Sequence, residues 1–469
     1  MAGQVSRRAF LRSCASGAVV LAGGAALAGC AGIGGAAAPK TQSPKVLLLL
    51  RPWATYATAS QQTVDTLVYE ATAPWRAQHP GVDIKIVNAL TALETQMLSG
   101  DAPDVYHSYH PGTIFSTQGF TMDLTKYIKD SHASLGVFNQ AQMALFQRPD
   151  GIRALPCYLG IETLVVNYGI IDQLGLEAPQ TGWSYADYAT LCTSIASSSN
   201  DRIVGGAFGL GGLGGGNNGN GTLPPEPVLQ GFGGSYVSPT NDALCTVDTP
   251  QVRQAVDWAY SLGRENAITN PSRYPTFSIQ YGNFIAGNVA MALAYTFQLI
   301  SYAQSWTGLN WGFVELPSFP ATGAPVTACT SDLYAINPAT KYPTLSWDLL
   351  HWLTFEPTWQ RSMMKVFLLS PALVSLWDEW VSKVEQYAPP LQNKNLATFA
   401  ALARGGHAYP SVVMRYAPAT TSQYMNTWGT KMWDHTVSVE LGLTQMAHQI
   451  NVLEQESAKQ AGAAPASAT

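Results

Sequence analysis

Hydrophobic positions along the chain form short continuous runs that are separated by stretches of helical periodicity. The first run, KVLLLLR at 45–51, is typical of a strand buried on both faces. A helical pattern follows, which Pro74 is predicted to end or bend. Next come an alternating strand, GVDIKIVNA, a helix closed by Gly100 and a third strand, PDVYHS. This alternating order of strands and helices predicts a parallel sheet with helices on its faces.

The later pattern predicts a second group of strands and then a helical region. Between 151 and 176, two strand-like runs are joined through Pro156 and Gly160, and Ser184 is predicted to cap the helix that follows. VRQAVDWAYSL is predicted to be helical, whereas NVAMALAYTF, WGFVELP and DLYAIN are predicted to be strands. From Thr344 onward the pattern is mostly helical, and no internal repeat of fixed period is present.

The N-terminus carries an export signal. Residues 6–12 read SRRAFLR, an apolar run of small residues follows, and LAGC ends at Cys30. Paired arginines before an apolar run of this length are typical of a cleaved signal. SRRAFL resembles a twin-arginine signal, and LAGC resembles a bacterial lipobox with a lipid on the Cys30 sulfur. We expect residues 1–29 to be removed and residues 30–44 to form a flexible stalk, so that the protein is anchored on the outer face of the cell membrane.

Composition excludes some partners and qualifies one tempting motif. Charged residues make up 12% of the chain and the net charge is −5, without basic runs, so nucleic acid is excluded as a partner. The segment 205–221 is glycine-rich, but it lacks the Gly-Lys-Ser/Thr of a phosphate-binding loop, so we expect a mobile surface insertion. Residues 459–469 are predicted to be a disordered tail.

The cysteines and histidines predict no metal site. Cys157, Cys192, Cys245 and Cys329 show no paired spacing, so buried thiols are expected, although a disulfide is permitted outside the cell. His107 and His110 lack the neighbouring carboxylates of a metal site. Neither G-x-S-x-G nor H-E-x-x-H occurs, so no cofactor or catalytic residue is predicted. A glycoside hydrolase stays open, because a sugar-binding cleft with Asp or Glu resembles a glycosidase.

Three predicted strands end in polar or aromatic side chains instead of core residues. Arg51 and Trp53 follow the first strand, the segment 107–110 (His-Ser-Tyr-His) follows the third, and Tyr158 follows Pro156. Ligands of open parallel sheets sit at the carboxyl ends of the strands. Rings can cover the apolar face of a sugar, while His, Arg, Ser and Tyr bond its hydroxyls. These residues predict a carbohydrate cleft; the alternative for each is packing between helices.

A series of blocks, in order, resembles the family 1 extracellular solute-binding proteins of bacterial ABC importers, the group that includes maltodextrin-binding proteins. LSGDAPDV is similar to the family's G-x-x-P-D-[VI] block, and 151–188 is similar to its L-P…N…P-x-T-W block. FIAGNVAMALAYTF is similar to its F-x-x-G-x-[AV]-A-M segment. WGFVELPSFP, DLYAIN and DLLHWLTFEPTWQ complete the order, so the resemblance covers nearly the whole chain after the signal.

The resemblance implies an α/β, two-lobed periplasmic-binding-protein-like fold of type II, with lobes joined by crossing hinge strands. The implied N-terminal lobe comprises 45–155 and 327–372, and the C-terminal lobe comprises 156–326 and 373–458. If the crossing strands run side by side, a disulfide between Cys157 and Cys329 across the hinge stays open beside the default of separate buried thiols.

The resemblance also implies a set of ligand contacts at strand ends, at the hinge and at aligned aromatic positions. His110 departs from the aromatic or acidic residues of the family, and LPPEP stands where many relatives carry a stacking ring. The implied ligand residues are Arg51, Trp53, His107, Tyr109, His110, Tyr158, Gly160, Glu162, Phe232, Tyr295, Phe297, Ser331, Asp332, Tyr424 and Trp428.

The implied function is that of a monomeric lipoprotein that captures a mono- or oligosaccharide by hinge closure and delivers it to an ABC permease. It is therefore expected not to be an enzyme. Glycerol phosphate or another non-sugar solute is the alternative cargo, although an anion would require clustered Arg or Lys, and only Arg51 is evident. A secreted lipoprotein glycoside hydrolase is the second alternative.

Overall fold

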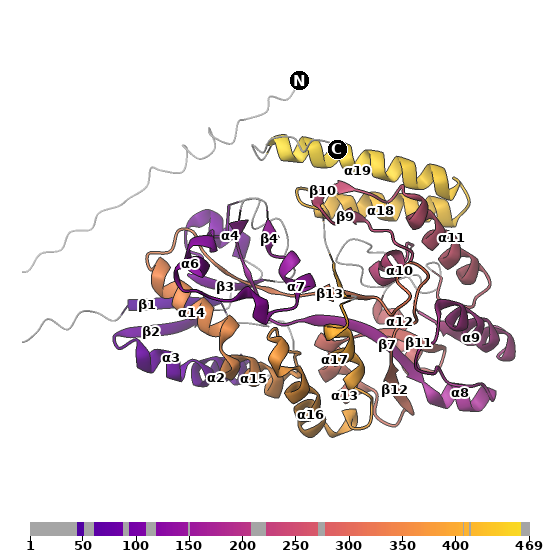
Figure 1. The fold of residues 1–469 in the computed structure, drawn as a ribbon, viewed down its shortest axis with the longest axis horizontal. Coiled ribbons are helices and arrows are strands. Elements are labelled where there is room, and N and C mark those ends of the chain that lie inside the picture. The colour runs from indigo at the N-terminus through magenta and orange to yellow at the C-terminus, as the bar shows by residue number, and fades with distance from the viewer. Residues whose placement is uncertain are drawn as a thin grey trace, which may run out of the picture. The chain divides into compact units, whose positions relative to one another are not determined.

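The computed structural model describes residues 45–50, 61–87, 93–108, 119–148, 151–207, 222–270, 277–406, 408–411 and 414–460. Several predicted features lie outside these ranges: the signal with Cys30, the stalk, most of the glycine-rich segment, Arg51, Trp53, Tyr109, His110 and the tail from 461. Among the described residues, the chain forms two large mixed sheets with helices packed against them (Figure 1).

The first sheet has five strands in the order β2-β1-β3-β14-β6. Its strands are β1 (Lys45–Leu50), β2 (Val82–Val87), β3 (Val105–Ser108), β14 (Leu333–Ile336) and β6 (Leu155–Pro156). β1 pairs in parallel with both β2 and β3, which confirms the predicted parallel core, while β14 runs antiparallel to β3 and β6. Two strands distant in sequence therefore complete a sheet that the N-terminal segment begins.

The helices of this sheet follow the predicted pattern. They are α2 (Gln61–Ala71), α3 (Ala73–Gln78), α4 (Leu93–Ser99), α6 (Thr125–Asp130) and α7 (Gln140–Ala144). The predicted bend falls at Thr72, between α2 and α3, and Pro74 lies in the first turn of α3, where its missing N–H has no helical partner to lose. Trp75 is then buried in the core beneath the sheet.

The second sheet has six strands, with β7 paired to three of them. Its strands are β7 (Gly160–Asn167), β8 (Val204–Gly206), β11 (Val289–Tyr295), β12 (Trp311–Val314), β13 (Thr327–Thr330) and β15 (Ala408–Pro410). Every residue of β7 and of β11 is buried, as their continuous apolar runs predict. Short two-stranded sheets add β4 (Gln147–Arg148) with β5 (Gly151–Ile152), and β9 (Val237–Ser238) with β10 (Asn241–Cys245).

The start of the glycine-rich segment corrects one prediction. Gly205 and Gly206 belong to the buried strand β8 and not to a surface insertion. A Cβ on Gly205 would lie 2.3 Å from the Cα of Cys192, and one on Gly206 would lie 2.0 Å from the hydroxyl of Tyr188. These glycines are needed because α9 (Tyr185–Ser198) packs closely against the strand.

Helices cover the second sheet and dominate the last part of the chain, as predicted. Ser184 caps α9 in a capping box with Asp187, which confirms the predicted helix start. The last two helices, α18 and α19, pack against each other (Figure 1). The other helices are α8 (Tyr168–Leu174), α10 (Glu226–Gly231), α11 (Pro250–Arg264), α12 (Phe277–Ile285), α13 (Leu299–Ser305), α14 (Pro343–Phe355), α15 (Pro357–Phe367), α16 (Trp377–Tyr387), α17 (Ala397–Arg404), α18 (Pro418–Trp433) and α19 (Val439–Gln460).

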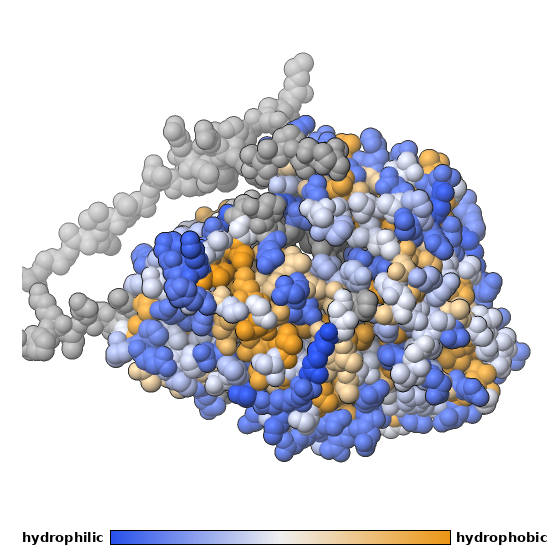
Figure 2. Space-filling model, in the orientation of Figure 1, coloured by the Kyte–Doolittle hydropathy of each residue, from blue (hydrophilic) through white to orange (hydrophobic). Residues whose placement is uncertain are grey.

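The apolar core is divided in the same way as the sheets. One large cluster of buried side chains surrounds the second sheet, and two smaller clusters pack against the first. On the surface, hydrophilic and weakly hydrophobic residues are interspersed over the face shown in Figure 2, with a group of hydrophobic residues left of centre. None of the helices in the described ranges is long and apolar enough to cross a membrane.

Candidate functional site

The chain passes between the two sheets at three places, which we call the crossing segments: 157–159, 331–332 and 368–373. The first two link β6 to β7 and β13 to β14, and the third links α15 to α16. The first two are joined by a hydrogen bond from the Cys157 N–H to the Asp332 carbonyl at 3.0 Å. The first and third meet in a bridge between Tyr158 and Pro371. Segments far apart in sequence are thus joined at one point.

A buried polar triad joins two of these segments to His107 on β3. The Nε2 atom of His107 lies 2.9 Å from Oδ2 of Asp332, and the Tyr158 hydroxyl donates to Oδ1 of Asp332 at 3.3 Å. β14 follows Asp332 directly and pairs Tyr334 with His107, so the strand register brings the carboxylate to the histidine. The structure therefore brings together three of the predicted ligand residues.

The amide of Gln142, which the sequence analysis missed, ties this triad to a fourth element. Its Nε2 donates to the Tyr158 carbonyl at 2.6 Å and to Oγ of Ser331 at 3.4 Å, and the side chain is fully buried. Ser331, also predicted, donates in turn to the Asp332 carbonyl at 2.7 Å. A glutamine among the apolar positions of the short helix α7 was the available signal.

A second polar group joins the first and third crossing segments. Oγ of Ser370 donates to the Leu159 carbonyl at 2.6 Å and to Oγ1 of Thr296 at 2.9 Å. Thr296 in turn accepts from the N–H of Ile161 at 3.2 Å. No sequence pattern pointed to these hydroxyls, because their partners lie 74 or more residues away along the chain.

Three of the predicted rings gather beside the crossing segments. Phe297 lies with its centroid 6.3 Å from that of Tyr158 and 5.1 Å from that of Tyr295. It is only partly buried, and it packs against the core clusters of both sheets. A ring that contacts both cores is placed to respond to any movement of one sheet against the other.

The other predicted rings lie elsewhere. Phe232 packs against Tyr185, Trp258 and Phe319, with centroids 5.5–5.8 Å away. We call these four residues the aromatic cluster. Trp428 lies on α18, where its Nε1 donates to Oε1 of Gln449 on α19 at 2.9 Å. Tyr424 lies one turn before it on the same helix, partly buried.

Two further predicted residues lie on β7 and are closely packed. A Cβ on Gly160 would lie 2.4 Å from Cγ2 of Thr330, so no side chain fits where β7 and β13 pair. The carboxyl of Glu162 is buried, and burial followed by the nearby charge of Glu226 raises its pKa well above the ordinary value. The predicted residues His107, Tyr158, Glu162, Ser331 and Asp332 are each at most 4% exposed. A solute would contact them only after the surrounding segments move apart.

The implied disulfide is not formed. Cys157 and Cys329 are both free, buried thiols. Cys157 packs in the core of the first sheet beside Tyr334 and Asp332, whereas Cys329 packs in the core of the second sheet. Burial raises the pKa of both thiols, so they stay protonated and unreactive. The crossing strands place the two cysteines in different cores, which the alignment of crossing strands could not reveal.

Comparison with known proteins identifies the family. The profile of the bacterial extracellular solute-binding proteins matches residues 58–358, which is more than half of the chain. The chain belongs to this family. The predicted family resemblance is therefore confirmed, although no curated protein sequence matches the chain.

Solved structures confirm the fold that this family implies. The chain is similar to a cyclic α-maltosyl-1,6-maltose binding protein from Arthrobacter globiformis, with 16% identity, 88% and 100% of the two chains covered and a TM-score of 0.69. It is also similar to a substrate-binding protein from Listeria monocytogenes in complex with cycloalternan, with 15% identity, 87% and 98% of the two chains covered and a TM-score of 0.66. A third similar structure, a solute-binding protein from Thermotoga lettingae, holds α-D-tagatose (16%, 88% and 100%, 0.60). The periplasmic-binding-protein-like fold is thus established for this family member.

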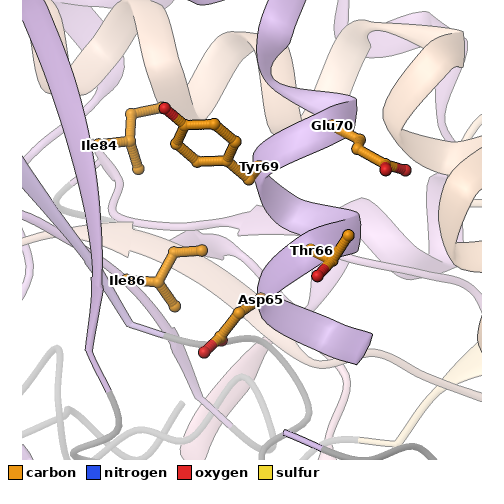
Figure 3. A pocket seen from close by; sticks show the side chains of 6 residues that line it. All are labelled: Asp65, Thr66, Tyr69, Glu70, Ile84 and Ile86. Atoms are coloured by element: carbon orange, nitrogen blue, oxygen red, sulfur yellow. The ribbon is translucent and has the colours of Figure 1, made fainter. Parts of the chain in front are cut away.

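Two surface pockets lie outside the predicted site. One, of about 460 Å³, is lined by α2 and β2 (Figure 3), where the Tyr69 ring points toward Ile84 and the Asp65 side chain lies near Ile86. The other, of about 430 Å³, lies between α17 and the chain around Glu315. Neither is lined by any predicted ligand residue. Within the described ranges, no group of three or more His, Cys, Asp or Glu is arranged to hold a metal ion.

Proposed function

We propose that this solute-binding protein captures a neutral carbohydrate outside the cell and delivers it to an ABC permease. The observation that carries the proposal is the meeting of rings and polar groups at the crossing segments. Phe297 and Tyr158 supply ring faces, and His107 and Asp332 supply donors and acceptors for hydroxyls. Two of the similar solved structures hold cycloalternan and α-D-tagatose, and a third is of a cyclic α-maltosyl-1,6-maltose binding protein; together they support the class but not the size of the cargo.

The charges around the site favour an uncharged solute. Three carboxyls lie on or beside the crossing segments: those of Asp332, Glu162 and Glu226. Asp332 is paired with the imidazole of His107. In the described part of the chain, no Lys or Arg forms an ion pair with any of these three carboxyls. An anion such as glycerol phosphate would therefore find acidic groups at the site and no Lys or Arg paired with them to compensate its charge. Anionic cargo is therefore the weaker alternative.

The mechanism is binding without chemistry. A solute that contacts both sheets is expected to stabilise the form in which they approach each other, and so to shift the population toward that closed form. The crossing segments at 157–159, 331–332 and 368–373 act as the hinge, close to the lobe boundaries at 155–156, 326–327 and 372–373 that the resemblance implies. The permease then recognises the closed form. A lipid on Cys30 would keep the monomeric receptor near the permease and raise its local concentration.

The test is a thermal-shift screen of the chain from residue 31 onward against mono-, di- and oligosaccharides, polyols and glycerol phosphate. Ligand at 100 times its dissociation constant adds about 2.7 kcal/mol to the unfolding free energy, which is a clear rise in melting temperature. Recovery of the sugar intact distinguishes binding from hydrolysis, and a cleaved product would establish the glycoside hydrolase instead.

A matched pair of variants locates the site. Phe297→Ala removes the ring beside the crossing segments, and Trp428→Ala removes a ring from α18. We expect Phe297→Ala to weaken sugar binding much more than Trp428→Ala, because only Phe297 contacts both cores. The proposal would be overturned if only anions raised the melting temperature, or if no carbohydrate raised it.

A further inference from the structure

Two buried carboxyls lie within electrostatic reach of each other beside the second sheet. Glu162 lies on β7 and Glu226 is the first residue of α10, and each is only 4% exposed. α10 packs against β13, and β13 is tied to β7 at Glu162 itself. There Oγ1 of Thr327 donates to the Glu162 carbonyl at 2.8 Å and accepts from its N–H at 3.1 Å. The two acids therefore belong to a helix and a strand that are both held against β13.

The surroundings of the pair are neutral. The groups that act electrostatically on or with Glu162 are Glu226 from α10, Tyr281 from α12, Tyr302 from α13 and Cys329 from β13. Burial raises the pKa of each of these tyrosines and of the thiol, so all three stay uncharged over the physiological range. On its own helix, the Glu226 side chain forms a hydrogen bond with the side chain of Gln230. None of these groups offers a positive charge.

The hydrogen bonding of Glu162 is incomplete. Its Oε2 atom is buried and has no hydrogen-bond partner among the residues that the structure describes. A buried carboxylate without a partner is costly, and a second carboxylate nearby raises that cost. A proton on one of the two acids removes a charge and supplies a donor.

We infer that Glu162 and Glu226 retain at least one proton up to neutral pH, and that its loss in more alkaline solution loosens α10 from β7 and β13. The pair is thus a pH-sensitive switch. Glu162 lies on β7, and α10, which carries Glu226, packs against β13; these two strands lead directly into the crossing segments at Gly160 and Thr330. The inference rests on the fold alone and does not require a particular solute.

The direction of the pH effect follows from linkage. Burial raises the pKa of Glu226 from 4.5 to about 7, and burial with the charge of Glu226 raises that of Glu162 well above 4.5. The folded chain therefore holds these protons more tightly than the unfolded chain. Stability is fully present below about pH 4.5 and is lost as the pH rises through about 7 and beyond. Within that window, each retained proton makes the unfolding constant rise about tenfold per pH unit.

The experiment is urea unfolding of the protein at intervals from about pH 5 to about pH 9. We expect the midpoint of the wild-type protein to fall as the pH rises. Glu226→Gln, which imitates the protonated acid, should fall less steeply and be the more stable protein above neutral pH. Glu162→Gln is the second variant, with the same expectation. Glu265→Gln, an exposed acid at the end of α11, is the control and should follow the wild type.

Two outcomes would overturn the inference. One is a wild-type profile that superimposes on those of Glu226→Gln and Glu162→Gln throughout the range. The other is a wild-type midpoint that stays constant between about pH 5 and about pH 8, which decides the matter even if neither variant folds.

Discussion

The crossing segments are buried and the aromatic cluster is buried or partly buried, yet the two regions are held together by opposite kinds of interaction. At the crossing segments, amide, hydroxyl, imidazole and carboxylate groups bond to one another and to backbone carbonyls. In the aromatic cluster, four rings meet edge to face or stacked, and the contacts are apolar. The crossing segments depend on the directions of hydrogen bonds, and the aromatic cluster depends on close packing that leaves no space unfilled.

This difference corresponds to what each region has to do. A hydrogen bond contributes only about 0.5–1.5 kcal/mol net, because water or another partner can replace it. A set of such bonds can therefore be exchanged when two sheets move. Close-packed rings have no alternative partners, since any gap forfeits contact energy. Polar crossing segments can exchange their partners, as the proposed hinge requires, whereas the apolar cluster cannot rearrange without losing contacts.

The largest effect is expected from emptying the aromatic cluster. Phe319 is 1% exposed, and its ring lies against Gly231, where a Cβ would be within 2.2 Å of it. Phe319→Ala should reduce the free energy of unfolding by about 3–5 kcal/mol, because it leaves a cavity that its neighbours cannot fill. Urea unfolding measures the loss. Phe319→Leu is the control with the smaller expected loss, and equal stability of Phe319→Ala and the wild type would contradict the packing argument.

A smaller loss is expected from removing the central acceptor of the crossing segments. Asp332→Ala leaves both His107 and the Tyr158 hydroxyl without this partner, so the unfolding free energy should fall by about 2–3 kcal/mol. Asp332→Asn keeps an acceptor for Tyr158 and should lose less. The same urea series tests both variants. If Asp332→Asn were as destabilised as Asp332→Ala, the charge rather than the hydrogen bonding would hold the triad together.

The smallest effect is expected where one amide is replaced by an apolar side chain of similar shape. Gln142→Met removes two donated hydrogen bonds and should cost about 1–2 kcal/mol of unfolding free energy. Arg361→Met is the matched comparison: it breaks the exposed pair with Glu379 between α15 and α16, which should contribute under about 1 kcal/mol. A greater loss for Arg361→Met than for Gln142→Met would reverse the assignment of the buried network as the stronger link.

The sequence allowed most of the elements to be predicted, because their signals are local. The strands β7 and β11 were evident from continuous apolar runs, and the start of α9 was evident from Ser184, since a cap acts within one turn. The family blocks were equally readable, being short segments in a fixed order. The glycines of β8 were misread, because the helix that packs against them is close in space and carries no sign of this in the segment itself.

The site was predictable as a set of residue types but not as an arrangement. His107, Tyr158, Ser331 and Asp332 were singled out individually. Only the folded structure, through its sheet register and packing, showed that these residues are linked by hydrogen bonds and that Gln142 joins them. It also showed that Phe232 lies elsewhere, in the aromatic cluster. Their burial was equally hidden, because exposure depends on which segments cover a residue.

Sequence alone thus determined the α/β class, the positions of the strands and the family, since apolar periodicity, caps and motifs act over a few residues. Tertiary structure alone decided that Cys157 and Cys329 stay apart in two cores and that Glu162 lies within electrostatic reach of Glu226. The physical reason is the distance along the chain over which each kind of interaction acts. A side chain sets the conformation of its own segment, but the free energy of a buried charge, a thiol or a ring depends on neighbours that only the folded chain brings to it.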